Sequence, residues 1–292
     1  MTDLPDWARH AKLAVKSRLI DLRAGFVKRF MSYDGAQLQA ALRRVGVRDG
    51  DDLMLHSAFA RHHGYAGNVE QLADVFIETL GSRGNLLMVS LPYRSSTLQY
   101  LQRLRQFDVS RTPSMMGLVS EHFRRRPDVL RSLHPTHPVL VHGPDAAWYT
   151  AGHENTLYAC GPDTPFARLA ERDGLAVFLN VPFGTFTFFH HLEHLVHRDL
   201  PFPLYTDEVF EVPVIDQRGE RGIVRTHAFT PEAIQRRRFP VLERALRARG
   251  AISAARVGNT RIEAIRVRDA IACTHDLRAR RELFYDLDAR MP

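Results

Sequence analysis

The chain has 292 residues, 45% apolar and 25% charged, which suits a globular protein and leaves no apolar run long enough to span a bilayer. Its net charge of +7 favours anionic ligands, but no basic stripe with interleaved aromatic residues indicates a nucleic-acid partner. Two cysteines, Cys160 and Cys273, and the lack of an apolar signal segment at the N-terminus predict a protein of the reducing cytoplasm.

Residues 5–31 have the pattern of a basic amphipathic helix. The apolar residues on or near one of its faces are Leu13, Ile20, Phe26, Val27 and Phe30. We treat residues 1–33 as this helix and residues 34–292 as a single α/β domain. Two roles fit the helix: packing on the domain or on a second subunit, which we favour, or lying on a membrane surface.

From residue 35 onward, predicted strands and helices alternate. Strands are expected over residues 52–56, 85–91, 139–141 and 175–181. Helices are expected over residues 35–45, 69–80, 95–105, 117–126, 144–151, 164–172 and 190–197. Such alternation indicates a mixed central sheet with helices on both faces.

The pattern changes after Pro203. Alternating strands are expected over 209–215 and 222–228, then a helix over 231–249, strands over 251–257 and 261–267, and a final helix. This second half adds an antiparallel extension to the α/β sheet. The arginine clusters 124–126 and 236–238 are expected to be solvated helix faces.

His134 is the first candidate for chemistry. Pro135 pushes the residue before it into extended backbone, so His134 does not sit easily in a helix. Its imidazole titrates near neutrality and is able to take a proton from an attacking amine or water. The alternative is a hydrogen-bonded structural histidine at the start of a strand, and local sequence does not decide between the two. His137 is a weaker candidate.

A second group of candidates is the block His190-His191-Leu192-Glu193-His194. On a helix, His190, Glu193 and His194 share one face. The pattern matches the H-x-x-E-H signature of a zinc peptidase class, which would need a third ligand downstream, with Glu263 as the suggestion. The other interpretation is that Glu193 orients or charges His134 across the site.

Two turns with small residues are able to present backbone N–H groups to an anion. His56 and Ser57 end a predicted strand, and the turn 112–114 precedes the predicted helix that begins at Gly117. Neither turn is a P-loop or a G-x-G-x-x-G motif, so the pattern does not specify a nucleotide.

The order of these motifs resembles the aminoglycoside 3-N-acetyltransferase family, over residues 34–272. The RS-x-HP element at His134 and the TPS-M-G element at 112–117 are specific when they occur together. The matching segments are LMLHSAF (53–59), GSRGNLLMVSLPY (81–93), FDVSRTPSMMGLVSEHFRRRPDVLRSLHPTHPVLVHG (107–143), CGPDTPFARLAERDG (160–174), the H-x-x-E-H block and VGNTRIEAIRVRD (257–269).

The resemblance implies an α/β fold that binds acetyl-CoA and passes its acyl group to the amine of a small molecule, an amino sugar or an aminoglycoside. By resemblance, His134 would be the general base and Glu193 its acid partner, with His190 in the same H-x-x-E motif. No metal is implied. The residues implied to hold the phosphates and pantetheine arm of the cofactor are His56, Ser57, Thr112, Ser114, Met115 and Gly117.

Four features depart from the family pattern: Thr136, Pro138, the pair His62 and His63, and the apolar Phe186, Phe188 and Phe189 before His190. They bear on the acceptor and on whether catalysis is retained. Two alternatives therefore stay open, a zinc-dependent hydrolase that uses His190, Glu193 and His194, and a catalytically degenerate relative that binds a partner. The sequence is also compatible with a homo-oligomer.

Overall fold

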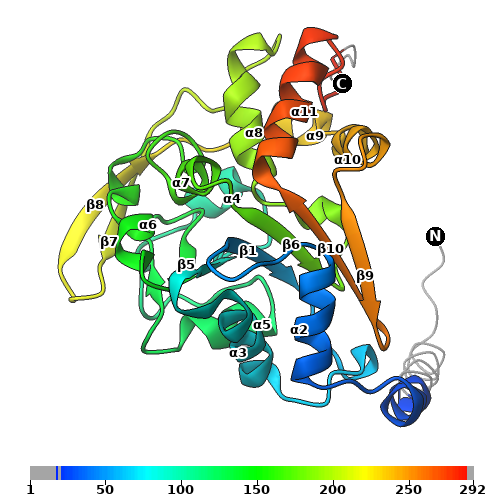
Figure 1. Ribbon diagram of the computed structural model, residues 1–292. Coiled ribbons are helices and arrows are strands. Elements are labelled where there is room, and N and C mark those ends of the chain that lie inside the picture. Colours follow the sequence, from blue (N-terminus) through cyan, green and yellow to red (C-terminus); the bar gives the residue numbers. More distant parts are fainter. Residues whose placement is uncertain (1–17, 19–20, 288–292) are drawn as a thin grey trace, which may run out of the picture.

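Figure 1 shows the computed structural model, which describes residues 18 and 21–287. The first part of the predicted helix at 5–31, including Leu13 and Ile20, lies outside the described residues, whereas residues 21–30 are helical. Val27 is 2% exposed, but Phe26 and Phe30 are 58% and 64% exposed, so these three do not share one buried face. In the part described, no helix is long and apolar enough to cross a membrane.

A seven-stranded mixed sheet lies at the centre, in the order β4-β5-β2-β1-β6-β10-β9 (Figure 1). β1 pairs in parallel with β2 and β6, and the other neighbours are antiparallel. The strands are β1 (Asp52–Ser57), β2 (Asn85–Val89), β4 (Leu130–Arg131), β5 (Val139–His142), β6 (Leu175–Leu179), β9 (Ser253–Val257) and β10 (Thr260–Arg266). This confirms the predicted mixed sheet with an antiparallel extension.

Helices cover both faces of this sheet (Figure 1). One face carries α2 (Gly35–Arg44), α3 (Val69–Leu80) and α5 (Leu118–Arg124). The other face carries α6 (Ala146–Thr150), α7 (Pro165–Glu171), α8 (Phe189–Val196), α10 (Phe239–Ala248) and α11 (Val267–Ala279). Strand β1 serves both cores because successive side chains point to opposite faces: Met54 joins one core, while Leu53 and Leu55 join the other.

A second, three-stranded sheet holds β3 (Phe107–Asp108), β7 (Phe210–Ile215) and β8 (Arg221–Thr226). β7 and β8 form the predicted antiparallel pair, and β3 adds to β7 in parallel. The two-residue strands β3 and β4 were not predicted, since they are too short to give an alternating pattern. The predicted helix at 95–105 is shorter than expected and is found as α4 (Thr97–Leu101).

The single helix predicted over 231–249 is wrong. The chain forms α9 (Pro231–Arg236) and then α10, with Arg237 extended between them at φ −58° and ψ 135°. Pro240 has no N–H to donate back to Arg236, which removes a hydrogen bond that a continuous helix would need. The backbone of Arg237 pairs instead with Tyr285.

The expected solvated face at 236–238 is also wrong, because the side chains of Arg236 and Arg237 are only 10% and 11% exposed. In the other cluster, the side chain of Arg124 is 8% exposed and pairs with Glu121. Both clusters therefore contain arginines that form buried ion pairs.

Candidate active site

The candidate site lies where the parallel strands β1, β2 and β6 end. His56 is the last residue but one of β1, Ser90 follows β2, and the chain after β6 leads into α8. In α/β sheets this carboxyl edge gathers the loops that bind ligands. The segment after His134 reaches the same edge, because the Ser90 N–H donates to the Pro138 carbonyl at 2.9 Å and β5 then runs antiparallel to β2.

A cavity of about 110 Å³ opens at this edge. Its lining includes Leu55, His56, Ser57, Met116, Ser120 and Thr187. Two of the predicted cofactor residues, His56 and Ser57, are thus in place beside it. The other four predicted cofactor residues do not line the cavity: Thr112, Ser114, Met115 and Gly117. Their neighbours Met116 and Ser120 do line it.

His56 is a neutral wall of this cavity. Its Nε2 accepts a hydrogen bond from the Thr187 N–H at 3.1 Å, and its ring stacks on Phe178 with centroids 5.1 Å apart. Burial lowers the pKa of His56 to about 4. At neutral pH its ring therefore contributes shape to the cavity and no positive charge for a phosphate, and its acceptor Nε2 is already bonded to Thr187.

The turn at Ser114 is held by the first turn of α5. The Ser114 N–H donates to Glu121 Oε2 at 2.8 Å, and the Ser114 and Ser120 hydroxyls lie 2.6 Å apart. Hydrogen bonds from Arg124, opposed by burial and helped by the Ser114 N–H and Arg125, lower the pKa of Glu121 to about 2. Glu121 was not predicted at the site, although an acidic residue in the first turn of a helix is a recognisable signal.

Arg131, in the RS-x-HP element, ties three segments together. Its guanidinium donates to the carbonyls of Ser90 at 2.9 Å, Val109 at 3.1 Å and Thr112 at 2.6 Å. Arg131 is 4% exposed and lies over the Phe107 ring, and burial lowers its pKa to about 9. Sequence patterns gave no sign of this role, since the three acceptors are backbone groups.

His134 is fully buried, and its ring stacks on His153 with centroids 4.6 Å apart. Its Nδ1 accepts from the Thr136 N–H at 3.3 Å and lies 3.2 Å from Thr136 Oγ1, which is 3.1 Å from His137 Nδ1. Burial, with the neighbouring histidines, lowers the pKa of His134 well below its ordinary value. The imidazole is therefore neutral and bonded to a hydroxyl.

His190 and Glu193 form a close pair on α8. His190 Nδ1 lies 2.6 Å from Glu193 Oε2, and the His190 side chain is 16% exposed while Glu193 is fully buried. Arg237 donates to both Glu193 oxygens at 2.6 and 3.0 Å, and the Tyr285 hydroxyl donates to Oε1. Burial alone would raise the pKa of Glu193, but Arg237 and His190 outweigh it and the pKa is lowered. Glu193 is thus a buried carboxylate.

The expected direct support of His134 by Glu193 is not what the geometry gives. In the described part of the chain, the Glu193 carboxylate hydrogen-bonds to His190, Arg237 and Tyr285 and not to His134. The connection between the two runs through rings and a hydroxyl: His190 lies edge-on to His137 with centroids 5.4 Å apart, and His137 leads to Thr136. The direct partner of Glu193 is His190.

The zinc hypothesis gains no support from the side-chain positions. His194 Nδ1 lies 3.0 Å from the Tyr205 hydroxyl, and Glu263 is ion-paired with Arg247 and Arg261 on the sheet. Among the residues that the structure describes, no group of three or more His, Cys, Asp or Glu side chains is arranged to hold a metal ion.

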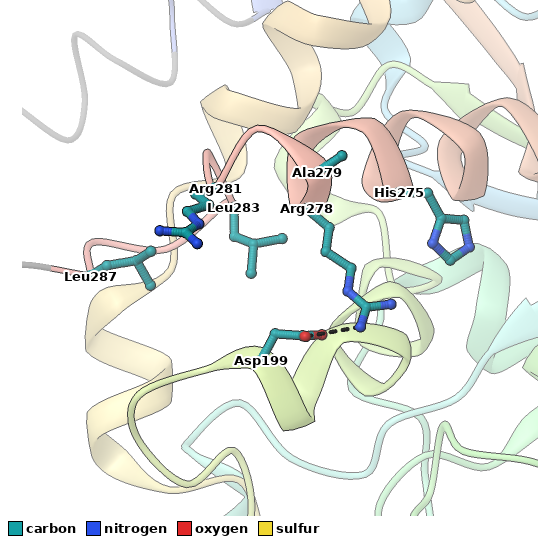
Figure 2. A pocket seen from close by; sticks show the side chains of 7 residues that line it. All are labelled: Asp199, His275, Arg278, Ala279, Arg281, Leu283 and Leu287. Atoms are coloured by element: carbon teal, nitrogen blue, oxygen red, sulfur yellow. Dashed lines mark hydrogen bonds and ion pairs between the residues drawn. The ribbon is translucent and has the colours of Figure 1, made fainter.

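A larger hollow of about 590 Å³ lies elsewhere, between the end of α11 and the chain after α8 (Figure 2). Asp199 and Arg278 line it and form an ion pair at 2.9 Å, beside Leu283. None of the predicted site residues lines this hollow, so volume alone does not mark the candidate site.

The chain is similar to known proteins in sequence and in fold. A family model described as aminoglycoside 3-N-acetyltransferase matches residues 54–278. Aminoglycoside N(3)-acetyltransferase VII of Streptomyces paromomycinus is 28% identical over 259 residues, which cover 80% of this chain and 88% of the relative. Aminoglycoside N(3)-acetyltransferase III of Pseudomonas aeruginosa is 28% identical over 191 residues, covering 59% and 70% of the two chains.

Two solved structures show the same fold. AAC-VIa bound to sisomicin has a TM-score of 0.69 and 26% identity, and the match covers 85% of this chain and 98% of that one. AAC-IIIb in a binary complex with CoASH has a TM-score of 0.70 and 22% identity, with 88% and 99% covered.

Replacing Glu121 by Gln should destabilise the protein at pH 7 by about 1–2 kcal/mol, because charge-assisted hydrogen bonds to Arg124 and Ser114 are lost. The pKa of Glu121 is depressed in the folded state, so this stabilisation is present above the ordinary value of 4.5 and is lost as the pH falls toward about 2. Urea unfolding of both proteins between pH 7 and pH 3 should show the difference narrowing. Glu70→Gln, at a side chain that is 67% exposed, is the matched control. A difference that does not change with pH would contradict the role of Glu121.

Proposed function

This chain belongs to the aminoglycoside 3-N-acetyltransferase family, and from that premise we propose that it transfers the acetyl group of acetyl-CoA to an amine of an aminoglycoside or a related amino sugar. The family makes the chain an N-acetyltransferase. The observation that carries the rest is the pair of His190 with the buried Glu193 on α8. The pair does not line the cavity, but the His190 N–H donates at 3.0 Å to the carbonyl of Thr187, which does.

His190 is the base that the geometry favours. The Glu193 carboxylate accepts from Nδ1–H of His190, and this leaves the lone pair of Nε2 free to take a proton. As the amine attacks, the new C–N bond forms, the thioester C–S bond breaks, and His190 takes the proton that the amine loses. Glu193 stabilises the resulting imidazolium, and the thiolate of CoA leaves.

His134 is the second candidate for the base, as the family resemblance implied. Against it stand its complete burial and the absence of a carboxylate among its hydrogen-bond partners in the described residues. In favour of it stands the path through Thr136 and His137 to the ring of His190. On this path His134, through Thr136, helps to hold His137, whose ring lies against His190.

We propose the cavity beside His56 and Ser57 for the thioester end of acetyl-CoA. Its walls are small hydroxyl and apolar groups, which suit a pantetheine arm and do not suit a polycation. The turn from Thr112 to Gly117, with Ser114 and Met115, would border the rest of the cofactor. AAC-IIIb, which was solved with CoASH, has the same fold and supports this donor.

A turnover assay distinguishes His190 from His134 as the general base. His190→Asn should lower kcat by about 10²–10⁴-fold, the usual contribution of a general base, while acetyl-CoA binding is retained. His134→Asn should lower the free energy of unfolding but keep most of kcat, because it changes a buried stack on His153. The measurement is thiol release from acetyl-CoA with sisomicin, which AAC-VIa binds, and with glucosamine as acceptors.

If His134→Asn lowered kcat much more than His190→Asn did, His134 would be the base. Acetyl-CoA binding without acetylation of either acceptor would contradict an aminoglycoside or simple amino-sugar substrate and would favour the degenerate relative. Stoichiometric zinc in the purified protein, required for turnover, would revive the hydrolase alternative.

Ser57→Leu should weaken acetyl-CoA binding at least tenfold, about 1.4 kcal/mol, because the larger side chain fills a cavity of about 110 Å³. Isothermal titration, supported by the rise in melting temperature with ligand, measures the change. Ser82→Leu is the control, since Ser82 is exposed before β2 at the opposite end of that strand. Equal affinities in the two variants would place the cofactor elsewhere.

A further inference from the structure

The geometry points to Arg237 and Tyr285 as positioning residues that keep Glu193 ionised and thereby fix the tautomer and the basicity of His190. We infer this on the basis of the proposed function, in which His190 and Glu193 are the acid–base pair. The inference adds two residues that no motif indicated. Tyr285 lies beyond residues 54–278, the part of the chain that the family model matches.

The need for these partners comes from burial. Glu193 is fully buried, and a carboxylate without a partner in such a place takes up a proton. Arg237 prevents this with two charge-assisted hydrogen bonds, at 2.6 and 3.0 Å, from a side chain that is itself 11% exposed. Tyr285 donates a further hydrogen bond to Oε1.

The backbone is built to place both residues. Arg237 is extended between α9 and α10 and pairs with Tyr285, and hydrogen bonds on either side hold the pairing: the Arg238 N–H donates to the Phe284 carbonyl at 2.9 Å, and the Asp286 N–H donates to the Arg236 carbonyl at 2.8 Å. This short antiparallel pairing fastens the C-terminal segment to the break between the helices. Both side chains consequently reach the same carboxylate.

The ionisation state of Glu193 decides which nitrogen of His190 carries the proton. A carboxylate accepts from Nδ1–H, so Nε2 keeps its lone pair. A protonated Glu193 would donate to Nδ1, and the neutral ring would then carry its proton on Nε2 and be unable to act as the base. Arg237 thus selects the active tautomer through Glu193, to which both Arg237 and His190 are hydrogen-bonded.

Arg237 is the charged group that faces this pair from the neighbouring elements. The titratable and charged groups around Glu193 and His190 on other elements are Arg237, Tyr285, Cys160, Tyr205 and His137. Burial raises the pKa of Cys160, Tyr205 and Tyr285 and lowers that of His137, so these four are neutral at pH 7. Removal of Arg237 therefore changes the local charge by one unit, and none of the four other described groups around the pair supplies a cation in its place.

The test is the pH profile of kcat/KM with acetyl-CoA and an accepted amine. In the wild type, the rate rises with pH as the pair loses the proton on His190. Arg237→Met removes a cation, so the pKa of the pair rises and the acidic limb should move to higher pH by about one to three units. Glu193→Gln removes an anion, so its limb should move to lower pH, and Arg237→Lys should restore most of the wild-type position.

A structural role alone would lower the rate of Arg237→Met without moving the limb, and that result would overturn the inference. Arg238→Met is the matched control, because that side chain is 47% exposed and its ion pair with Asp286 lies away from Glu193; its limb should not move. Should Arg237→Met not fold, Tyr285→Phe removes one hydrogen bond to Glu193 and should move the limb in the same direction by less. An unmoved limb in that variant, too, would overturn the inference. Full activity of His190→Asn and Glu193→Gln would instead contradict the proposed function on which it rests.

Discussion

The ion pair between Glu193 and Arg237 is the interaction on which the second half of the chain depends. Removal of one partner of such a buried pair typically costs about 3–5 kcal/mol, because the other charge is left without compensation. The pair requires Arg237 to leave the helical conformation, which separates α9 from α10. It also accounts for the position of the C-terminal segment, since Tyr285 reaches Glu193 only when residues 284–286 pair with the chain at the break.

Arg131 has the corresponding role in the first half of the chain, with different chemistry. Its hydrogen-bond partners are the carbonyls of Ser90, Val109 and Thr112, so it holds backbone segments together and these three bonds involve no carboxylate. These carbonyls lie at the end of β2, after β3 and in the turn that precedes α5. One buried cation thus joins the central sheet to the small sheet, and the other joins α8 to the C-terminal segment.

The sequence predicted the parts of the structure that depend on local periodicity. The strand at β1 and the helix at α3 follow from apolar patterns, and the mixed sheet follows from the alternation of strands and helices. The break at Arg237 was missed because the amphipathic pattern continues across it. Pro240 disfavours a continuous helix there, and the extended conformation of Arg237 is held by a pairing with Tyr285, 48 residues away in the chain, which no local pattern contains.

The same distinction holds for the site. The H-x-x-E motif predicted the contact between His190 and Glu193, because residues three apart on a helix are neighbours. The expected contact of Glu193 with His134 required knowledge of the tertiary fold, in which His137 and Thr136 lie between them. His56 and Ser57, at the end of β1, share a cavity with Ser120 of α5, whose hydroxyl donates to the Val89 carbonyl at the end of β2 at 3.1 Å. The motifs therefore identified the candidate residues, whereas the contacts between distant residues depended on the tertiary fold.

Under the proposed function, a chain of net charge +7 has to accept an amine that is cationic in solution, and the electrostatics of the site are compatible with this. Burial lowers the pKa of His56, His134, His137 and His190, so the histidines around the site are neutral at pH 7. The charge of Arg237 is cancelled by Glu193. An approaching ammonium group therefore meets no fixed positive charge among these residues. In the proposed mechanism, a histidine with a low pKa would by itself be a weak base, and the Glu193 carboxylate would compensate by stabilising the imidazolium as it forms. While His190 is neutral, such a site would not repel a cationic amine, and Glu193 would support the charge of His190 once the proton is transferred.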